Sequence, residues 1–374
     1  MLKLIIIQAE YGDCFLLQSS DGSNSLSVLI DGGPSQTYEK SLKPTMDTIL
    51  TNNKLDLVIL SHIDNDHVLG LLDLFEEIKM EKGSTGSKFL KVSGLWHNSF
   101  SDIIGVNNDT NKKMRNLFLS DRFSVFEQDN KVHELPALGA LRGISEGRDL
   151  TKLARYLHIP INSQFSEGLI VTRKGDNFIK LQNMRVSILG PTQRNLEKLR
   201  KTWNDWLRSH PQAEVTTKDY EALQMLDASI TNLSSIMFII ESAGKKILFT
   251  GDGLGRDLLD VLSEKQMLSS EGRLHVDILK VPHHGSERNV SEQFFETVTA
   301  DIYIISANGR DDNPSFSTLK WIIESGKKSN RKITIVATNK TENIEKAEQL
   351  YDPKEFQYRF IFLDPQTNLL ELKP

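Results

Sequence analysis

Residues 57–71, LVILSHIDNDHVLGL, constrain the fold of this 374-residue chain most strongly. The continuous apolar run at 57–60 predicts a buried strand, and the apolar spacing from Leu71 onward becomes helical. Two histidines and two aspartates stand between these segments: His62, Asp64, Asp66 and His67. Because imidazoles and carboxylates are good metal donors that a turn can bring together, the stretch predicts a metal-ligand cluster. The alternative interpretation is a solvated acidic loop whose histidines are incidental.

The composition is that of an ordinary globular protein, with 39% hydrophobic and 25% charged residues and a net charge of -5. This charge gives no overall preference for nucleic acid. Cys14 is the only cysteine, which excludes an intrachain disulfide and suits a reducing compartment. The first residues predict a strand and not a signal peptide, and no stretch approaches the ~18 apolar residues that span a membrane. We therefore expect a cytoplasmic protein without a membrane segment.

Apolar runs predict two strand-rich blocks. The first has a helix at 37–52 and strands at 2–8, 14–18, 26–30 and 57–60. The second opens with a hairpin at 234–250 and continues with strands at 275–281, 302–306 and 332–338. Helices are expected between these strands at 256–267, 291–298 and 315–326. The tail, at 357–363 and 369–372, is expected to form a closing hairpin.

The intervening residues 85–220 have a weaker pattern. Helices are expected there at 112–127, 134–141, 149–157 and 194–208. We interpret this region as a mostly helical insertion within one domain of residues 1–374, acting either as a lid or as a structural elaboration. Its last part, residues 195–220, predicts an exposed arm that could be cut by a protease or bound by a partner.

Polar residues directly follow four of the predicted strands. Besides the opening cluster, they are Asp31, Asp252, His283 and His284. Residues at the carboxyl ends of core strands converge on one edge of a sheet or sandwich, where chemistry usually sits. Glycines flank nearly all of them, as expected where loops turn tightly around a site. Four such clusters together predict a functional site.

This set of residues resembles the signature of the metallo-β-lactamase fold, His-x-His-x-Asp-His followed by a later Asp and a later His. It looks most like the branch found in the carboxyl-terminal domain of the DNA-uptake protein ComEC, which carries His-x-Asp-x-Asp-His. Residues 61–67, SHIDNDH, match that central motif. Residues 11–13, 30–33, 248–252 and 279–286 resemble the branch's Gln-Gly-Asp, Ile-Asp-Gly-Gly, Leu-Leu-Thr-Gly-Asp and Leu-Lys-Val-x-His-His-Gly-Ser. The resemblance covers residues 1–80 and 225–320.

The resemblance implies an α/β fold, an αββα sandwich of the metallo-β-lactamase type, with one or two divalent metal ions at one edge. Carried over by position, the expected metal ligands are His62, Asp64, Asp66, His67, Asp252 and His283. His62 and Asp64 would hold the first ion, and Asp66 and His67 the second. Asp252 would bridge them, and either His283 or His284 would complete the second site, with His283 favoured as the ligand. The expected catalytic residues are Asp66, which would hold the attacking water, and His284, which would face the substrate or leaving group.

Four further residues are expected beside the ligands or at the substrate: Asp31, Asn232, Asn313 and Ser286. Asp31 would orient a ligand histidine through its second ring nitrogen. Asn232, or Asp227, stands where the family has a further histidine. Asn313 stands where the branch often has the histidine of His-Pro-Ser, and it can donate a hydrogen bond to a phosphate but cannot act as a general acid.

Asp64 stands where the usual signature has its second histidine. The additional oxygen ligand moves the metal preference from zinc toward harder ions. We therefore expect zinc or manganese, with magnesium as a further candidate.

The expected chemistry is hydrolysis by metal-activated water, because the chain has no Ser-His-Asp signature and no usable thiol. The resemblance implies a phosphodiesterase, namely a nuclease acting on DNA, whose phosphates could be held by Lys280, Arg288 and Arg310. One alternative is a hydrolase of small phosphoesters. Another is a regulated effector subunit, which residues 85–220 keep inactive until a protein partner or a protease acts.

Overall fold

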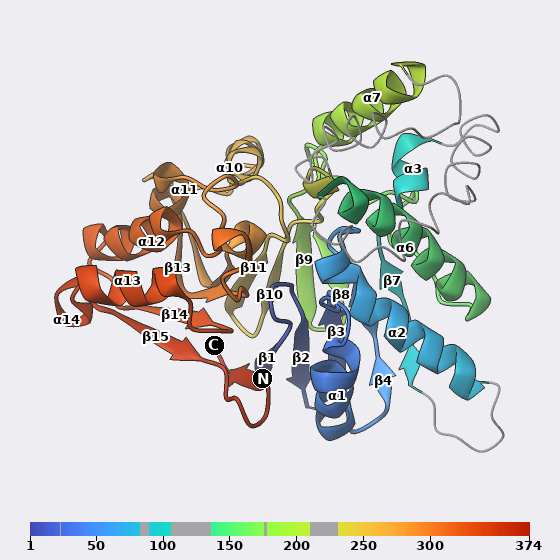
Figure 1. The fold of residues 1–374 in the computed structure, drawn as a ribbon, viewed down its shortest axis with the longest axis horizontal. Helices are drawn as coiled ribbons and strands as arrows, with labels where there is room; N and C mark the ends of the chain where they lie inside the picture. The colour runs from blue at the N-terminus through green and yellow to red at the C-terminus, as the bar shows by residue number, and fades with distance from the viewer. Residues whose placement is uncertain (23, 83–89, 106–135, 176–177, 210–230) are drawn as a thin grey trace.

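The computed structural model describes residues 1–22, 24–82, 90–105, 136–175, 178–209 and 231–374. Their strands form a six-stranded sheet, an eight-stranded sheet and a two-stranded pair, β4 (Lys54–Leu55) with β6 (Lys91–Val92). Helices cover the outer faces of the two large sheets (Figure 1). The fold is therefore the αββα sandwich of the metallo-β-lactamase type, as predicted. Within the described part of the chain, no helix is both long and apolar enough to cross a membrane.

The first sheet comes mainly from the N-terminal block, in the order β16-β1-β2-β3-β5-β7. Its strands are β16 (Leu369–Leu372), β1 (Leu2–Ile7), β2 (Phe15–Asp21), β3 (Asn24–Ile30), β5 (Leu57–Ile59) and β7 (Leu95–Trp96). Strands β3, β5 and β7 are parallel, and the other pairings are antiparallel. The carboxyl ends of β3, β5 and β7 therefore meet at one edge.

The second sheet has the order β15-β14-β13-β12-β11-β10-β9-β8. Its strands are β8 (Ile179–Leu181), β9 (Met184–Ile188), β10 (Phe238–Ser242), β11 (Lys245–Phe249), β12 (Leu274–Lys280), β13 (Val298–Ile305), β14 (Ile333–Ala337) and β15 (Tyr358–Phe362). Strands β10 and β11 form the predicted hairpin, and β11 to β15 are parallel.

Three hydrophobic layers hold the sandwich together. In β1, Leu4 and Ile6 point into the layer between the sheets, whereas Ile5 and Ile7 point toward the helices. All four are fully buried, because side chains alternate along a strand and both faces of this sheet are covered. The outer layer of the first sheet contains residues of α1 (Lys43–Ile49), α2 (Asn65–Lys82) and α6 (Pro136–Tyr156). A short π-helix, Tyr38–Leu42, precedes α1.

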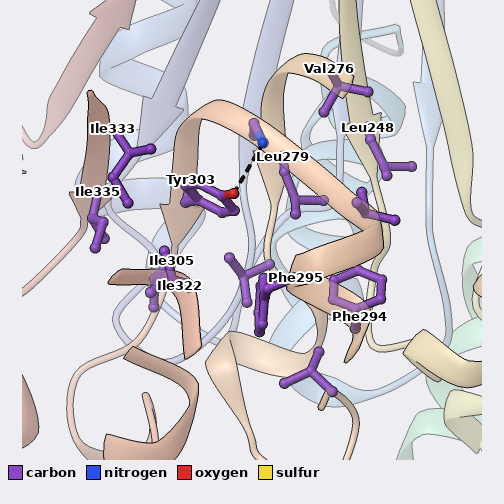
Figure 2. Close-up of a cluster of buried hydrophobic side chains, with 14 of the residues drawn as sticks. Leu248, Val276, Leu279, Phe294, Phe295, Tyr303, Ile305, Ile322, Ile333 and Ile335 are labelled. Atoms are coloured by element: carbon purple, nitrogen blue, oxygen red, sulfur yellow. Dashed lines mark hydrogen bonds between the residues drawn. The ribbon is translucent and has the colours of Figure 1, made fainter. Parts of the chain in front are cut away.

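The outer layer of the second sheet is shown in Figure 2. Its helices are α10 (Gly255–Glu264), α11 (Glu292–Thr297), α12 (Phe316–Lys328) and α13 (Glu342–Leu350), and the short α14 (Pro353–Phe356) follows. Phe294 and Phe295 of α11 are fully buried in this layer with Leu279 and Tyr303 of the sheet. The Tyr303 hydroxyl accepts a hydrogen bond from the Ala300 amide (3.0 Å), so its polar atom is satisfied within the core.

Two sequence expectations about these elements are wrong. The tail is not a hairpin, because β15 pairs with β14 in the second sheet and β16 pairs with β1 in the first. Pairing with β16 covers the edge of β1 that would otherwise be open. The second error concerns α2, which begins at Asn65, so that Asp66 and His67 lie in its first turn and not in the loop before it.

Residues 85–220 contribute to the sandwich as well as to its surroundings. Their described part supplies β7 to the first sheet and β8 and β9 to the second. The expected helices at 134–141 and 149–157 belong to one helix, α6, which packs on α2. Helices α3 (Phe100–Ile104) and α7 (Gln193–Ser209) pack together around Trp203 and Ile63. The expected helix at 112–127, and residues 210–220 of the expected arm, lie outside the described residues.

Candidate metal centre

The polar residues at the strand ends lie together at one edge of the sandwich. Asp31 follows β3, His62 follows β5, and Asp252 follows β11, while a single 3-10 turn, Pro282–Gly285, follows β12 and contains His283 and His284. A hydrogen bond from the Ile236 amide to the Ser61 carbonyl (2.9 Å) ties the loop of the first sheet to the segment that enters β10. The two halves of the chain therefore build this edge jointly.

Asp252 lies at the middle of the cluster and is only 2% exposed. Its carboxylate oxygens are 3.4 Å from the Nε2 atoms of both His67 and His284. They are 3.6 Å from Nε2 of His283 and 3.7 Å from Nε2 of His62. Four imidazole nitrogens therefore converge on one carboxylate.

One group of four side chains is close enough together to hold a metal ion. Ligand atoms of Asp66, His67, Asp252 and His284 all lie within 4.8 Å of one another. The Nε2 atoms of His67 and His284 are buried and make no hydrogen bond within the described part of the chain. Leaving such nitrogens unsatisfied costs free energy. A cation at this point would satisfy both of them, so the residues present fit a divalent metal ion.

The neighbouring half of the cluster contains His62 and Asp64. Nε2 of His62 is buried without a hydrogen bond among the described residues, and it lies 3.5 Å from Oδ2 of Asp64. Thr231 donates a hydrogen bond to the same Asp64 oxygen (3.0 Å). His62 and Asp64 offer fewer convergent ligand atoms than the group that contains His284, so an ion between them would be bound more weakly.

The burial of the two histidines after β12 is the reverse of what we expected. His284 is the buried one, and its Nε2 lies 3.1 Å from Oδ2 of Asp66. Its Nδ1–H donates to the Ser306 carbonyl (2.8 Å), which leaves Nε2 free for a metal. The side chain of His283 is 28% exposed, and its Nδ1–H donates to Oδ1 of Asn289 (2.7 Å). The geometry thus favours His284 as the ligand and His283 as the residue that faces the substrate.

Asp31 orients His67. Its carboxylate accepts hydrogen bonds from the amide and hydroxyl of Ser61 (2.7 and 2.8 Å) and from Nδ1–H of His67 (3.0 Å). The proton is therefore held on Nδ1, and the Nε2 lone pair faces Asp252. This is the contact that the resemblance implied for Asp31. Asp31 itself has a φ of 56°, in the strained left-handed region that often marks functional sites.

Close backbone contacts hold the start of α2 against the loops before it. The Asp13 amide donates to the Asp66 carbonyl (3.2 Å), and the Gly32 amide donates to the His67 carbonyl (2.8 Å). A Cβ atom at Gly70 would lie 2.0 Å from the Gly32 carbonyl oxygen, which no real side chain tolerates. Glycine is required at this contact, which brings the first turn of α2, and so Asp66 and His67, to the centre.

The carboxylates of the cluster attract positive charge. Burial by itself would raise the pKa of Asp252, but the imidazoles of His284, His283, His67 and His62 hold that pKa well below its ordinary value. Burial by itself would lower the pKa of His284, but the carboxylates of Asp252 and Asp13 raise that pKa to about 10. The cluster therefore takes up either protons or divalent cations, and metal binding releases protons.

Lys280 and Asp13 form a buried ion pair on the interior side of the metal centre. The sequence did not predict this pairing. We expected Lys280 to flank the site and hold a phosphate, but its side chain is 1% exposed and bound to Asp13. The only sequence signal for Asp13 is the resemblance of residues 11–13 to a Gln-Gly-Asp motif. Arg288 is exposed, and the Arg310 guanidinium lies 4.2 Å from the centre of the Tyr11 ring, so these two remain able to contact phosphate.

The other expected site residues lie around the two histidines after β12. Nδ2 of Asn232 is 3.5 Å from Nδ1 of His283, and the Ser286 amide donates to the His283 carbonyl (2.8 Å). Asn313 precedes Pro314, which packs against Gly285, and its buried Oδ1 has no hydrogen bond among the described residues. Asp227, the alternative to Asn232, lies outside the described residues.

The chain has four histidines between His67 and Asp252, of which His97 and His158 lie among the described residues. His158 is exposed. The 1% exposed His97 donates from Nε2–H to the Gly147 carbonyl of α6 (3.2 Å), and its imidazole is therefore committed to that helix. His133 and His210 lie outside the described residues.

Lowering the pH is expected to destabilise the folded protein through His97. Burial lowers its pKa from 6.5 to about 4. Between these values the unfolded chain takes up a proton that the folded protein does not, so the free energy of unfolding falls as the pH falls, by up to about 3 kcal/mol. Urea unfolding near pH 7 and near pH 5, with chelator present, measures the loss. His97→Gln should lose less stability than the wild type, and His158→Gln should lose the same amount. An equal loss in all three proteins would contradict this assignment.

One family model matches part of this chain. Residues 8–129 match the model of the Metallo-beta-lactamase superfamily. Residues 8–129 of this chain are therefore similar to that superfamily, and they include the central motif SHIDNDH. ComE operon protein 3 of Bacillus subtilis (strain 168) is 30% identical over 98 residues, which are 26% of this chain. The match spans only 12% of the length of that curated relative.

Three solved structures illustrate the structural matches, each with a TM-score below 0.5. The metallo-beta-lactamase fold protein YhfI from Bacillus subtilis is 12% identical, with 99% of this chain and 100% of that chain covered and a TM-score of 0.41. A diphosphatase from the PhnP family is 11% identical, with 99% and 97% covered and a TM-score of 0.38. Zn(2+)-bound PqqB from Methylobacterium extorquens is 10% identical, with 100% of both chains covered and a TM-score of 0.40.

Proposed function

We propose that this protein is a metal-dependent phosphodiesterase that cleaves DNA, as a member of the ComEC-like branch. The observation that carries the proposal is the position of Asp252, whose carboxylate lies 3.4–3.7 Å from the Nε2 atoms of four histidines. A buried carboxylate among four imidazoles suits one or two divalent cations and the hydrolysis that they support.

The residues divide into two metal sites that share Asp252. Asp66, His67 and His284 would hold one ion, and His62 and Asp64 the other. When bound, such ions supply an activated water and offset the charge that builds on a phosphoryl oxygen. Asp66 would accept a hydrogen bond from that water. His283, fixed by Asn289, would contact the phosphate or leaving group from the solvent side.

DNA is the proposed substrate because the central motif, SHIDNDH, resembles the ComEC branch. Arg288 and Arg310 provide local positive charge for a phosphate backbone in spite of the net charge of -5. The oxygen ligand Asp64 favours manganese or magnesium over zinc at the site that it shares with His62.

The test is cleavage of supercoiled plasmid and single-stranded DNA by purified protein, with manganese, zinc or magnesium added separately. A small phosphodiester, bis(p-nitrophenyl) phosphate, is assayed beside them, and Asp66→Ala is the inactive control. We expect nicking of DNA with manganese and none by Asp66→Ala. Cleavage of the small diester without cleavage of DNA would replace the nuclease with a hydrolase of small phosphoesters. No metal by elemental analysis and no cleavage of either substrate would refute the enzyme proposal.

A regulated effector is the second candidate, and the packing of Ile63 favours it. Ile63 stands between His62 and Asp64 and packs with Trp203 of α7, while Gly147 of α6 lies against its side chain. Helices from residues 85–220 thus contact the metal loop directly, and a partner or protease acting on them would reach the site. Cleavage of DNA only after limited proteolysis would favour this candidate, whereas equal cleavage before and after it would exclude it.

A further inference from the structure

The ion pair of Lys280 and Asp13 contacts the candidate metal centre from the protein interior. The ammonium of Lys280 binds the Asp13 carboxylate, donates to the Gly251 carbonyl (3.0 Å) and lies 3.6 Å from Oδ1 of Asp252. Asp13 lies 3.6 Å from Nδ1 of His284 and 3.9 Å from Nδ1 of His67. The pair thus reaches the shared carboxylate and both imidazoles of the more complete metal site.

Stability alone does not account for a charged pair at this depth. Both side chains are 1% exposed, and desolvating two charges costs about as much as their attraction returns, so apolar residues of similar size often serve equally well. Neither oxygen of Asp13 makes a hydrogen bond to another described group apart from the ion pair itself. The charges therefore have their main effect on the neighbouring centre.

The charges around the centre balance when Lys280 is counted as a cation. Five carboxylates lie there: Asp13, Asp31, Asp64, Asp66 and Asp252. With neutral imidazoles, one ammonium and two divalent ions neutralise them. A second acidic group, Asp13 with Asp31 and His67, also has the geometry to hold a cation. Its oxygens already face the Lys280 ammonium, the Ser61 donors and the His67 Nδ1–H.

We propose that the Lys280 ammonium serves as a built-in third cation, held by Asp13, whose positive charge beside Asp252 limits the affinity of the centre for divalent ions. The inference rests on the proposed metal-dependent function. It adds a residue that touches neither substrate nor metal but acts through the bridging carboxylate.

The test is titration of metal-free protein with Mn²⁺, measured calorimetrically and by competition with a chromophoric chelator. Lys280→Met should bind Mn²⁺ about tenfold or more tightly, and Asp13→Asn about tenfold or more weakly, because a unit charge within a few ångströms of a divalent ion changes affinity by this much even at the dielectric constant of water. The double variant, Asp13→Asn with Lys280→Met, keeps the net charge and should bind within about threefold of the wild type. Thermal unfolding in chelator checks that each variant is folded.

A purely structural role of the ion pair would not make Lys280→Met bind Mn²⁺ more tightly and Asp13→Asn bind it more weakly. If Lys280→Met fails to fold, Asp13→Asn and the double variant still decide the question. Weaker binding by both single variants and by the double variant would overturn the inference, as would unchanged binding in all three. If the wild type itself binds no divalent ion, the proposed function fails and this inference fails with it, whereas normal wild-type binding with unshifted variants refutes the inference alone.

Discussion

Asp252→Asn is expected to abolish hydrolysis and to remove bound metal. The carboxylate lies 3.4–3.7 Å from the Nε2 atoms of all four histidines, and an amide supplies neither its charge nor its second metal-binding oxygen. Activity should fall by more than about 100-fold, because even residues that merely support a ligand change affinity or activity by 10–100-fold. Elemental analysis of protein purified without chelator, and initial rates on the best phosphodiester substrate, measure the two losses.

The matched control is Asp257→Asn. Asp257 is also buried and accepts a hydrogen bond, from Asn195 (2.9 Å), but it lies in α10 outside the cluster. This variant should lose some stability while it keeps its metal and its activity. Retention of full metal content and activity by Asp252→Asn would exclude Asp252 as the shared ligand and with it the proposed mechanism.

His284→Ala and His283→Ala are expected to have different effects, although the two residues are adjacent. Loss of His284 removes one of four convergent ligands, so the metal content should fall by one ion and activity by more than about 100-fold, as for other ligand losses. Loss of His283 removes a half-buried side chain at the solvent side of Asp252, so the metal content should stay and kcat or KM should change.

His158→Ala provides the control for this pair, because His158 is exposed and lies outside the cluster. It should match the wild type in metal content and rate. Loss of an ion in His283→Ala with full metal in His284→Ala would show that the roles are reversed, as the sequence analysis had expected.

Short-range features of the sequence were sufficient to predict most of the strands and the place of the site. Apolar runs locate strands, and parallel strands bring their carboxyl ends to one edge, so the polar residues after β3, β5, β11 and β12 had to lie near one another. The central motif and its glycines are likewise contiguous in sequence. The resemblance of residues 30–33 implied the role of Asp31, and in the structure the loop after β3 lies beside the first turn of α2.

Only the tertiary structure decided which of the two adjacent histidines enters the metal group. His283 and His284 both have positive φ angles, 48° and 55°, and this turn points one imidazole inward and the other outward. Residue type and spacing carry no information about such a turn. The pairing of the tail could not be predicted from local pattern either, because β16 pairs with β1, which lies at the other end of the sequence.

The burial of Lys280 is the clearest difference between sequence and structure. A lysine at the end of an apolar strand predicts a solvated charge, and it becomes an interior cation only because Asp13, from the opposite sheet, meets it there. Local periodicity in the sequence thus located the strands and the strand ends at which the candidate ligands gather, and the resemblance of the motifs implied the fold class. Local sequence pattern does not encode contacts between the two halves of the chain. These contacts decided that His284 faces Asp252 from the interior and that Lys280 supplies the positive charge beside it.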